Sequence, residues 1–236
     1  MSGTRGLLLG FTFRSLYIER FKKTEDSKLT MLENNTKGLS RIQRERRAEI
    51  LESALGVFSL NGFRGASINE IAKAAKMSTP RLLYHFSDKQ QLYTELLKET
   101  LRLWLDPLEK IEDSDDPVSE ISAYIRRKLY ISQKYPRESR LFAGAILFGV
   151  QRTTSEVFDP LRHVFEEKIK LVEHWKARGL IPQLDAHHLM YSIWATTQHY
   201  ADFEAQISEL SPDKLPTLYD DAEAYLVPMY RKLLVP

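Results

Sequence analysis

Two helix-start signals lie close together in this chain, at Ser67 and Ser78. Ser67 is followed three residues later by Glu70, which is the arrangement of a capping box. Ser78 precedes Pro80, and proline suits the first turn of a helix because its missing N–H would be unpaired there anyway. The sequence therefore predicts two short helices joined by a turn around Lys76, which is a helix-turn-helix.

The second of these helices is predicted to have an apolar and a polar side. We expect Leu82, Leu83 and Phe86 to be buried on the apolar side. The other residues would project outward as polar side chains: Thr79, Arg81, Tyr84 and His85. A short helix with an exposed, donor-rich face is suited to the major groove of DNA. The alternative is a pair of small core helices with a solvated polar face.

Charge along the chain favours the first interpretation. Residues 37–89 contain ten Lys/Arg and five Asp/Glu, so this segment carries +5, and because the whole chain carries +2 the remainder carries −3. A basic segment in an otherwise acidic chain is typical of proteins that bind a polyanion. Arg44 and Arg47 lie early in a helix predicted from Arg41 to Asn61 and closed by Gly62, where they can reach phosphates.

Apolar residues recur at helical spacing in the rest of the chain, and no strand-like alternation is present, so the predicted fold class is all-α. A long helix should begin after Asp88 and run to about residue 108. The segment 141–150 is apolar on all sides, which predicts a central helix buried all round, and Pro228 should kink or shorten the last helix. The predicted domains are a leader (1–36), a helix-turn-helix DNA-binding domain (37–87) and a larger domain (88–236) whose linking helix is 88–108.

The first 36 residues differ from the rest. An apolar run at 7–13 is interrupted by Arg14 and lacks a small-residue cleavage site, so we reject export. A poorly ordered leader, with Met31 as the true start, is the favoured interpretation. The alternative is a basic amphipathic helix over 13–23 that contacts a membrane surface or covers the core. Cysteine is absent, which excludes disulfides and agrees with a cytoplasmic protein.

The stretch ILESALGVFSLNGFRGASINEIAKAAKMSTPRLLYHFSDKQQLY resembles the N-terminal signature of the TetR family of bacterial repressors. By this resemblance Ser67 and Lys89 are phosphate anchors, and Pro80 makes a tight backbone contact. The groove-facing residues it implies are Thr79, Arg81, Tyr84 and His85. Lys76 departs from the family, where glycine is usual, and a positive φ there would cost lysine about 1 kcal/mol. The resemblance also implies a homodimer on a palindromic double-stranded operator, released by a small-molecule effector.

The C-terminal segments WLDPLEKI, YPRESRLF and IWATTQHYADF resemble the pyrimidine-utilisation repressors of this family, which sense uracil and thymine. Trp194 and Gln198 stand four residues apart and would share a helix face. Gln198 could pair with the amide edge of a pyrimidine while Trp194 stacks on its ring. Trp104 and Phe142 are further candidate walls of the pocket. The alternative is that these tryptophans serve only core or dimer packing.

Small residues at 143–145 favour a wider, less polar cavity, so a hydrophobic effector such as a fatty acid or drug remains an alternative, as does a constitutive DNA binder without effector. An enzyme has little support. His187 and His188 are neighbours that point apart on a helix, unlike a zinc pair, and no serine lies in a nucleophile-elbow pattern. We expect no catalytic residue, metal site or cofactor. We also expect no membrane-spanning segment and no membrane partner.

The dimer should form through the last two long helices. Each subunit would then contribute one recognition helix, which is the second helix of its helix-turn-helix. Effector binding should shift the linking helix so that the two recognition helices lose the spacing of one DNA turn, about 34 Å.

Overall fold

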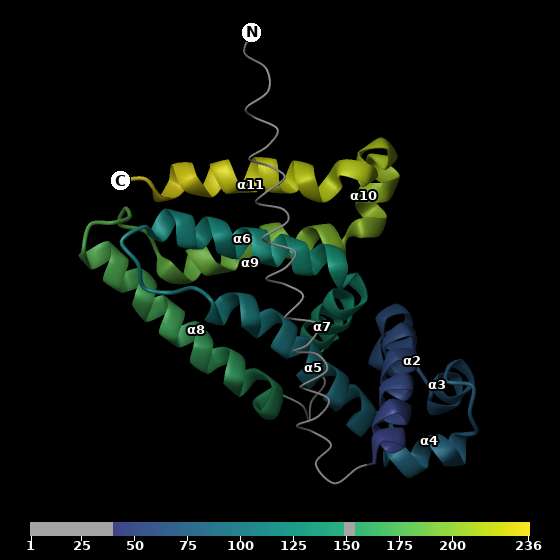
Figure 1. Cartoon of the computed structure of the whole chain (residues 1–236). Helices are drawn as coiled ribbons and strands as arrows, with labels where there is room; N and C mark the ends of the chain where they lie inside the picture. Colours follow the sequence, from purple (N-terminus) through teal and green to yellow (C-terminus); the bar gives the residue numbers. More distant parts are fainter. Residues whose placement is uncertain (1–39, 149–153) are drawn as a thin grey trace. The chain divides into compact units, whose positions relative to one another are not determined.

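Figure 1 shows the computed structural model of the chain, which describes residues 40–148 and 154–236. The chain divides into two compact units, residues 1–51 and 52–236, and each is described by itself. Helices account for all the regular structure in the described residues, which confirms the all-α class. The expectations for the leader, residues 1–36, lie outside the described residues.

Four helices form the N-terminal part of the described chain. They are α2 (Arg41–Gly65), α3 (Ile68–Ala74), α4 (Thr79–His85) and α5 (Lys89–Glu109). Gly62 lies within α2 at φ 65° and ψ 179°, so the helix is kinked at the residue that we expected to close it. Asp88 caps α5 as predicted, because its side chain accepts a hydrogen bond from the Gln91 backbone N–H.

The second compact unit contains α3, α4 and α5 and also all the helices that follow them in the described chain. They are α6 (Pro117–Lys134), α7 (Pro136–Phe148), α8 (Thr154–Ala177), α9 (Ala186–Asp202), α10 (Glu204–Leu210), the 3₁₀ helix η1 (Pro212–Thr217) and α11 (Leu218–Leu234). The last helix runs through Pro228 to Leu234, so this proline does not shorten it.

Helix α6 is central to the packing of this second unit. It contacts α9 and α11 along its length, and α5 contacts α6, α7 and α8. Figure 1 shows α6 and α9 side by side beneath α11. The largest fully buried side chains here include Trp175, Tyr124 and Tyr230, each of which contributes roughly 2 to 3 kcal/mol by burial.

The prediction of a helix buried all round was wrong for residues 141–148, and residues 149 and 150 lie outside the described residues. Leu141, Phe142 and Ala145 of α7 are buried, but Ile146, Leu147 and Phe148 are more than half exposed. The buried residues lie on one helix face, at spacings of one and four, so α7 packs as a one-sided helix although its composition is apolar throughout. Composition alone does not say which turn of such a helix is covered.

No described helix combines the length and the apolar character that crossing a membrane requires.

Candidate functional site

The start of α3 is fixed by a complete capping box. The Ser67 hydroxyl accepts a hydrogen bond from the Glu70 backbone N–H at 3.2 Å, and the Glu70 carboxylate accepts one from the Ser67 backbone N–H at 2.8 Å. The same carboxylate accepts a bond from the Ser67 hydroxyl, and these hydrogen bonds from Ser67 lower the pKa of Glu70. The cap therefore forms as the sequence predicted.

The turn between α3 and α4 has the left-handed geometry that glycine favours. Lys76 has φ 53°, and the Met77 backbone N–H donates to the Ala72 carbonyl at 3.0 Å. Ser78 is the N-cap residue of α4, but its side chain makes no capping bond. Instead the Thr79 hydroxyl donates to the Asn69 side-chain oxygen at 2.9 Å, which ties the start of α4 to α3.

Helix α4 has one buried and one exposed side. Leu82 and Phe86 are fully buried, four residues apart. Leu83, which we expected to be buried, is 42% exposed because it lies about 100° further round the helix. Tyr84 is 76% exposed, and Arg81 is also exposed.

The other candidates on this helix lie on or beside the exposed side. Pro80, in the first turn, is exposed, while Thr79 and His85 are half-buried. The His85 ring meets the Tyr84 ring edge to face at 5.3 Å. The exposed side of α4 therefore carries polar and aromatic side chains, and the Thr79–Asn69 hydrogen bond holds the helix against α3.

Lys89 holds the start of α5 against the end of α2. Its ammonium donates hydrogen bonds to the carbonyls of Phe63 and Ala66, both at 2.8 Å, and lies 4.5 Å from the Phe63 ring centroid. Two of its three N–H groups are therefore used, so at most one is available for a phosphate. Ser67, the other predicted anchor, is exposed.

Arg44 and Arg47 lie in the first turns of α2 and are half-buried. Both belong to the first compact unit, residues 1–51.

Two of the predicted effector residues lie on α9, and one of them is bonded to α6. The indole N–H of Trp194 donates to the Tyr124 hydroxyl at 2.7 Å. The Trp194 ring also meets Phe165 at 5.2 Å and Tyr191 at 6.1 Å. Gln198 lies one turn after Trp194 and is half-buried.

The other two predicted effector residues are buried on different helices. Phe142 on α7 is 5% exposed and meets Phe158 at 5.9 Å between ring centroids. Trp104 on α5 is 6% exposed, and the Lys128 ammonium lies 4.3 Å from its ring centroid. No described residue accepts a hydrogen bond from the Trp104 indole N–H.

Two polar stripes meet where α6 packs on α9. Tyr124, Lys128 and Ser132 recur at intervals of four along α6, and all three are buried. On α9 the stripe consists of Trp194, Gln198 and Asp202, also at intervals of four. The Trp194–Tyr124 hydrogen bond joins the stripes at one end, and the charges of Lys128 and Asp202 interact further along.

The α6 stripe was not predicted from the sequence. The signal was present in the spacing of Tyr124, Lys128 and Ser132, but a lysine in such a stripe is usually solvated.

Burial changes the acid–base properties of this region. It lowers the pKa of Lys128 to about 7, although the charge of Asp202 acts in the opposite direction. Burial raises the pKa of Asp202, and the hydrogen bond that its carboxylate accepts from the Ser139 hydroxyl opposes this rise. Burial also raises the pKa of the Tyr124 phenol.

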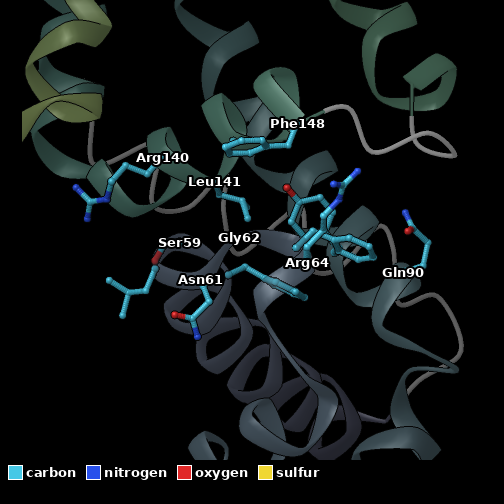
Figure 2. Close-up of a pocket in the computed structure, with 13 residues that line it drawn as sticks. Ser59, Asn61, Gly62, Arg64, Gln90, Arg140, Leu141 and Phe148 are labelled. Carbon is cyan, nitrogen blue, oxygen red and sulfur yellow. The ribbon is translucent and has the colours of Figure 1, made fainter.

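A separate groove of about 710 Å³ lies between the end of α2, the start of α5 and α7. Its lining includes Asn61, Arg64, Leu141 and Phe148 (Figure 2). Arg140 extends to one side of the groove in Figure 2. Its guanidinium pairs with the Glu204 carboxylate at 3.2 Å. None of the four predicted effector residues lines this groove, so it is not the predicted pocket.

The described residues contain no group of three or more His, Cys, Asp or Glu side chains that could hold a metal ion.

Two family models match adjoining parts of the chain. Residues 50–96 match the model for bacterial regulatory proteins of the tetR family, and residues 97–236 match the model for the C-terminal region of YcdC-like proteins. The chain belongs to the TetR family. The first match contains the capping box and all of α4, and the second contains both polar stripes.

Curated relatives agree with this assignment. The HTH-type transcriptional regulator RutR of Escherichia coli K12 is 38% identical over 172 residues, which cover 73% of this chain and 81% of RutR. The regulator AcrR of Shigella flexneri is 42% identical over 52 residues, 22% of this chain and 24% of AcrR. The chain is therefore a DNA-binding transcriptional repressor of the TetR type, and its relatives are regulators rather than enzymes.

Solved structures show the same fold. Apo AibR has a TM-score of 0.61 and 21% identity, with 81% of this chain and 99% of AibR covered. GusR of Salmonella enterica has a TM-score of 0.59 and 19% identity, with 84% and 99% covered. AibR has also been solved with isovaleryl coenzyme A and operator DNA, at a TM-score of 0.58 and 20% identity, covering 66% of this chain and 85% of that one.

Proposed function

We propose that this repressor binds a palindromic operator through α4 and is released from it by a small flat heterocycle, such as the pyrimidines uracil and thymine. The observation that carries the DNA half is the exposure of Tyr84 and Arg81 on a helix whose opposite side, Leu82 and Phe86, is fully buried. Arginine pairs well with guanine edges in the major groove, and tyrosine can contact bases or phosphates.

Phosphate contacts would add affinity to the base contacts of α4. Ser67 at the start of α3 is exposed, and a helix N-terminus attracts anions. Lys89 can donate its remaining N–H to a phosphate, and Pro80 can bring the backbone close to the DNA. Arg44 and Arg47 would add positive charge that attracts the phosphates over a longer range. The domains on this proposal are 37–87 for DNA binding and 88–236 for effector binding and dimerisation.

The effector half rests on the stripe of Trp194 and Gln198. A half-buried carboxamide has both a donor and an acceptor, which complement the adjacent N–H and C=O of a pyrimidine edge. Trp194 is held in place by its hydrogen bond to Tyr124, so its ring is preorganised for stacking. Trp104 and Phe142 would form further walls. The resemblance of residues 193–203 to pyrimidine-utilisation repressors supports the same class of effector.

A hydrophobic effector is the second candidate. The observation that favours it is the largely aromatic and apolar surroundings of Trp194, which include Phe165 and Tyr191.

A homodimer is required because one short recognition helix contacts only a half-site. The outer faces of α9 and α11 support it, since Tyr191 is 47% exposed, Tyr225 67% and Leu233 51%. Such large apolar side chains on neighbouring helices are typical of an interface. The protein would act in the cytoplasm.

The link between the two halves would be α5. Its first residue, Lys89, is bonded to the end of α2, and Trp104 lies near its other end. Effector binding that moves Trp104 would tilt α5 and change the separation of the two α4 helices, so that they no longer fit successive grooves. By linkage, the effector must then bind the DNA-free form more tightly.

The test has two stages. An operator is first selected from random duplexes by wild-type protein, and a palindrome with half-sites about one helical turn apart is expected. Uracil, thymine, a fatty acid and buffer alone are then titrated into the complex while fluorescence anisotropy reports release. Release by uracil or thymine supports a pyrimidine effector. Release by the fatty acid alone supports a hydrophobic effector instead. If no duplex is selected, the proposal is overturned.

A further inference from the structure

Lys128 is a buried cation without an obvious partner. It is 3% exposed, and its ammonium forms no hydrogen bond or ion pair with any described residue. Its contacts are the Trp104 ring face at 4.3 Å and the more distant charge of Asp202. Burying an ammonium that lacks a hydrogen-bond acceptor is costly, and buried charges in proteins are normally paired.

Two neighbouring groups also have hydrogen-bonding capacity that is not used. The indole N–H of Trp104 and the hydroxyl of Ser132 are buried, and neither has a partner among the described residues. Ser132 follows Lys128 by one turn on the same face of α6, and Trp104 is the ring that the ammonium covers. Three buried groups from two helices, the Lys128 ammonium, the Trp104 indole N–H and the Ser132 hydroxyl, can therefore donate hydrogen bonds, and no described residue accepts one from them.

Asp202 does not fill this role. Its carboxylate accepts a hydrogen bond from Ser139 on α7, and it lies beyond ion-pairing distance of Lys128. The electrostatic attraction between them is too weak to offset burial, because the pKa of Lys128 still falls to about 7. This donor set therefore fits an acceptor that the described residues do not supply.

We propose that Lys128, Trp104 and Ser132 form an anion-binding end of the effector site, so that the effector is a flat organic acid whose carboxylate pairs with the Lys128 ammonium. This rests on the proposed function, since it places the acid beside the Trp194 and Gln198 stripe. A carboxylate can accept up to four hydrogen bonds and neutralises the ammonium, and charge-assisted bonds of this kind are roughly twice as strong as neutral ones. Gln198, between Trp194 and Asp202 on α9, would then contact the ring that bears the carboxylate.

The first experiment compares matched acids and neutral compounds on the full-length protein at pH 6.5, by calorimetry. One pair is orotate, the 6-carboxylate of uracil, against uracil. The other is benzoate against benzamide. We expect the acid of at least one pair to bind at least tenfold more tightly than its neutral partner. If neither acid binds more tightly than its partner, the inference is overturned.

Variants then identify the group that recognises the acid. Lys128→Met keeps the length and apolar stem of the side chain, and we expect it to lose at least tenfold in affinity for the acid but less than threefold for the neutral partner. Trp104→Phe keeps a ring and removes only the indole N–H, so a several-fold loss for the acid is expected. Lys134→Met, on an exposed residue of the same helix, is the control. If Lys128→Met retains both its fold and full affinity for the acid, the inference is wrong.

The two proposals can fail separately. If uracil binds wild type more tightly than orotate, benzoate binds no more tightly than benzamide, and Lys128→Met binds uracil as well as wild type does, the acid inference fails and the pyrimidine effector stands. If benzoate binds through Lys128 and no pyrimidine binds, the acid inference stands and the pyrimidine class fails. Should Lys128→Met not fold, judged by circular dichroism, the same comparison is decided by Trp104→Phe and Ser132→Ala.

Discussion

The indole N–H of Trp194 donates a 2.7 Å hydrogen bond to the hydroxyl of Tyr124, which joins α9 to α6 beside the predicted effector site. Tyr124 is 1% exposed and Trp194 is half-buried. The bond therefore fixes the orientation of the tryptophan that the proposed effector would stack on.

Tyr124→Phe tests how much this bond contributes. The ring is kept but the indole N–H loses its acceptor, so the free energy of unfolding should fall by about 1 to 2 kcal/mol. Urea denaturation followed by tryptophan fluorescence measures the loss. Tyr130→Phe on the same helix, where the tyrosine is only half-buried, is the control. Equal unfolding free energies for wild type and Tyr124→Phe would show that the bond does not stabilise the fold.

The turn residue Lys76 gives a prediction in the stabilising direction. At φ 53° a lysine is strained by about 1 kcal/mol relative to glycine. Lys76→Gly should therefore raise the free energy of unfolding by about that amount. Lys73→Gly, inside α3, should lower it by about 0.5 to 1 kcal/mol, because glycine weakens a helix interior. A destabilised Lys76→Gly would contradict the strain argument.

The capping box at Ser67 should stabilise the start of α3. Ser67→Ala removes the acceptor of the Glu70 N–H and should cost about 1 kcal/mol of stability, whereas Ser67→Thr should keep most of it. Thermal unfolding measures both variants. If Ser67→Ala and Ser67→Thr unfold at the same temperature, the hydroxyl does not stabilise α3.

The buried Lys128 makes stability depend on pH. Between its folded pKa of about 7 and the ordinary lysine pKa of 10.5, the unfolded state binds a proton that the folded state does not. The free energy of unfolding should therefore rise with pH across this window, by up to about 1.4 kcal/mol per unit. Asp202 contributes with the opposite sign, since its raised pKa makes the folded state bind the extra proton.

Comparison with Lys128→Met isolates this effect. As the pH rises from 7 to 9, the melting temperature of wild type should rise relative to that of Lys128→Met. A constant difference between the two proteins over that range would show that Lys128 keeps its ordinary pKa in the fold.

Local chemistry explains which features the sequence predicts well. The capping box at Ser67, the cap at Asp88 and the positive φ of Lys76 depend on residues within a few positions of each other, and the structure has all three. The family resemblance, carried by residues 50–93, was equally local and is confirmed.

Tertiary packing decides the features that the sequence did not predict. Leu83 and Phe148 are apolar and exposed in the structure, because none of the described helices covers their side. Lys89 was expected to bind phosphate, but most of its bonding capacity is used by carbonyls 23 and 26 residues earlier. The burial of Lys128 likewise depends on helices distant in sequence, because its spacing from Tyr124 and Ser132 does not distinguish a buried lysine from a solvated one.

Operator binding by variants of α4 tests the central claim most directly. Once an operator has been selected, its affinity is measured at fixed salt for wild type, Tyr84→Ala, Arg81→Ala and, as a control that removes the same charge far along the chain, Arg162→Ala on α8. We predict that Tyr84→Ala and Arg81→Ala each weaken binding by at least about tenfold while folding normally, and that Arg162→Ala binds as wild type does. Wild-type affinity in both α4 variants would contradict the account, because the exposed side of α4 would then not be the surface that contacts DNA.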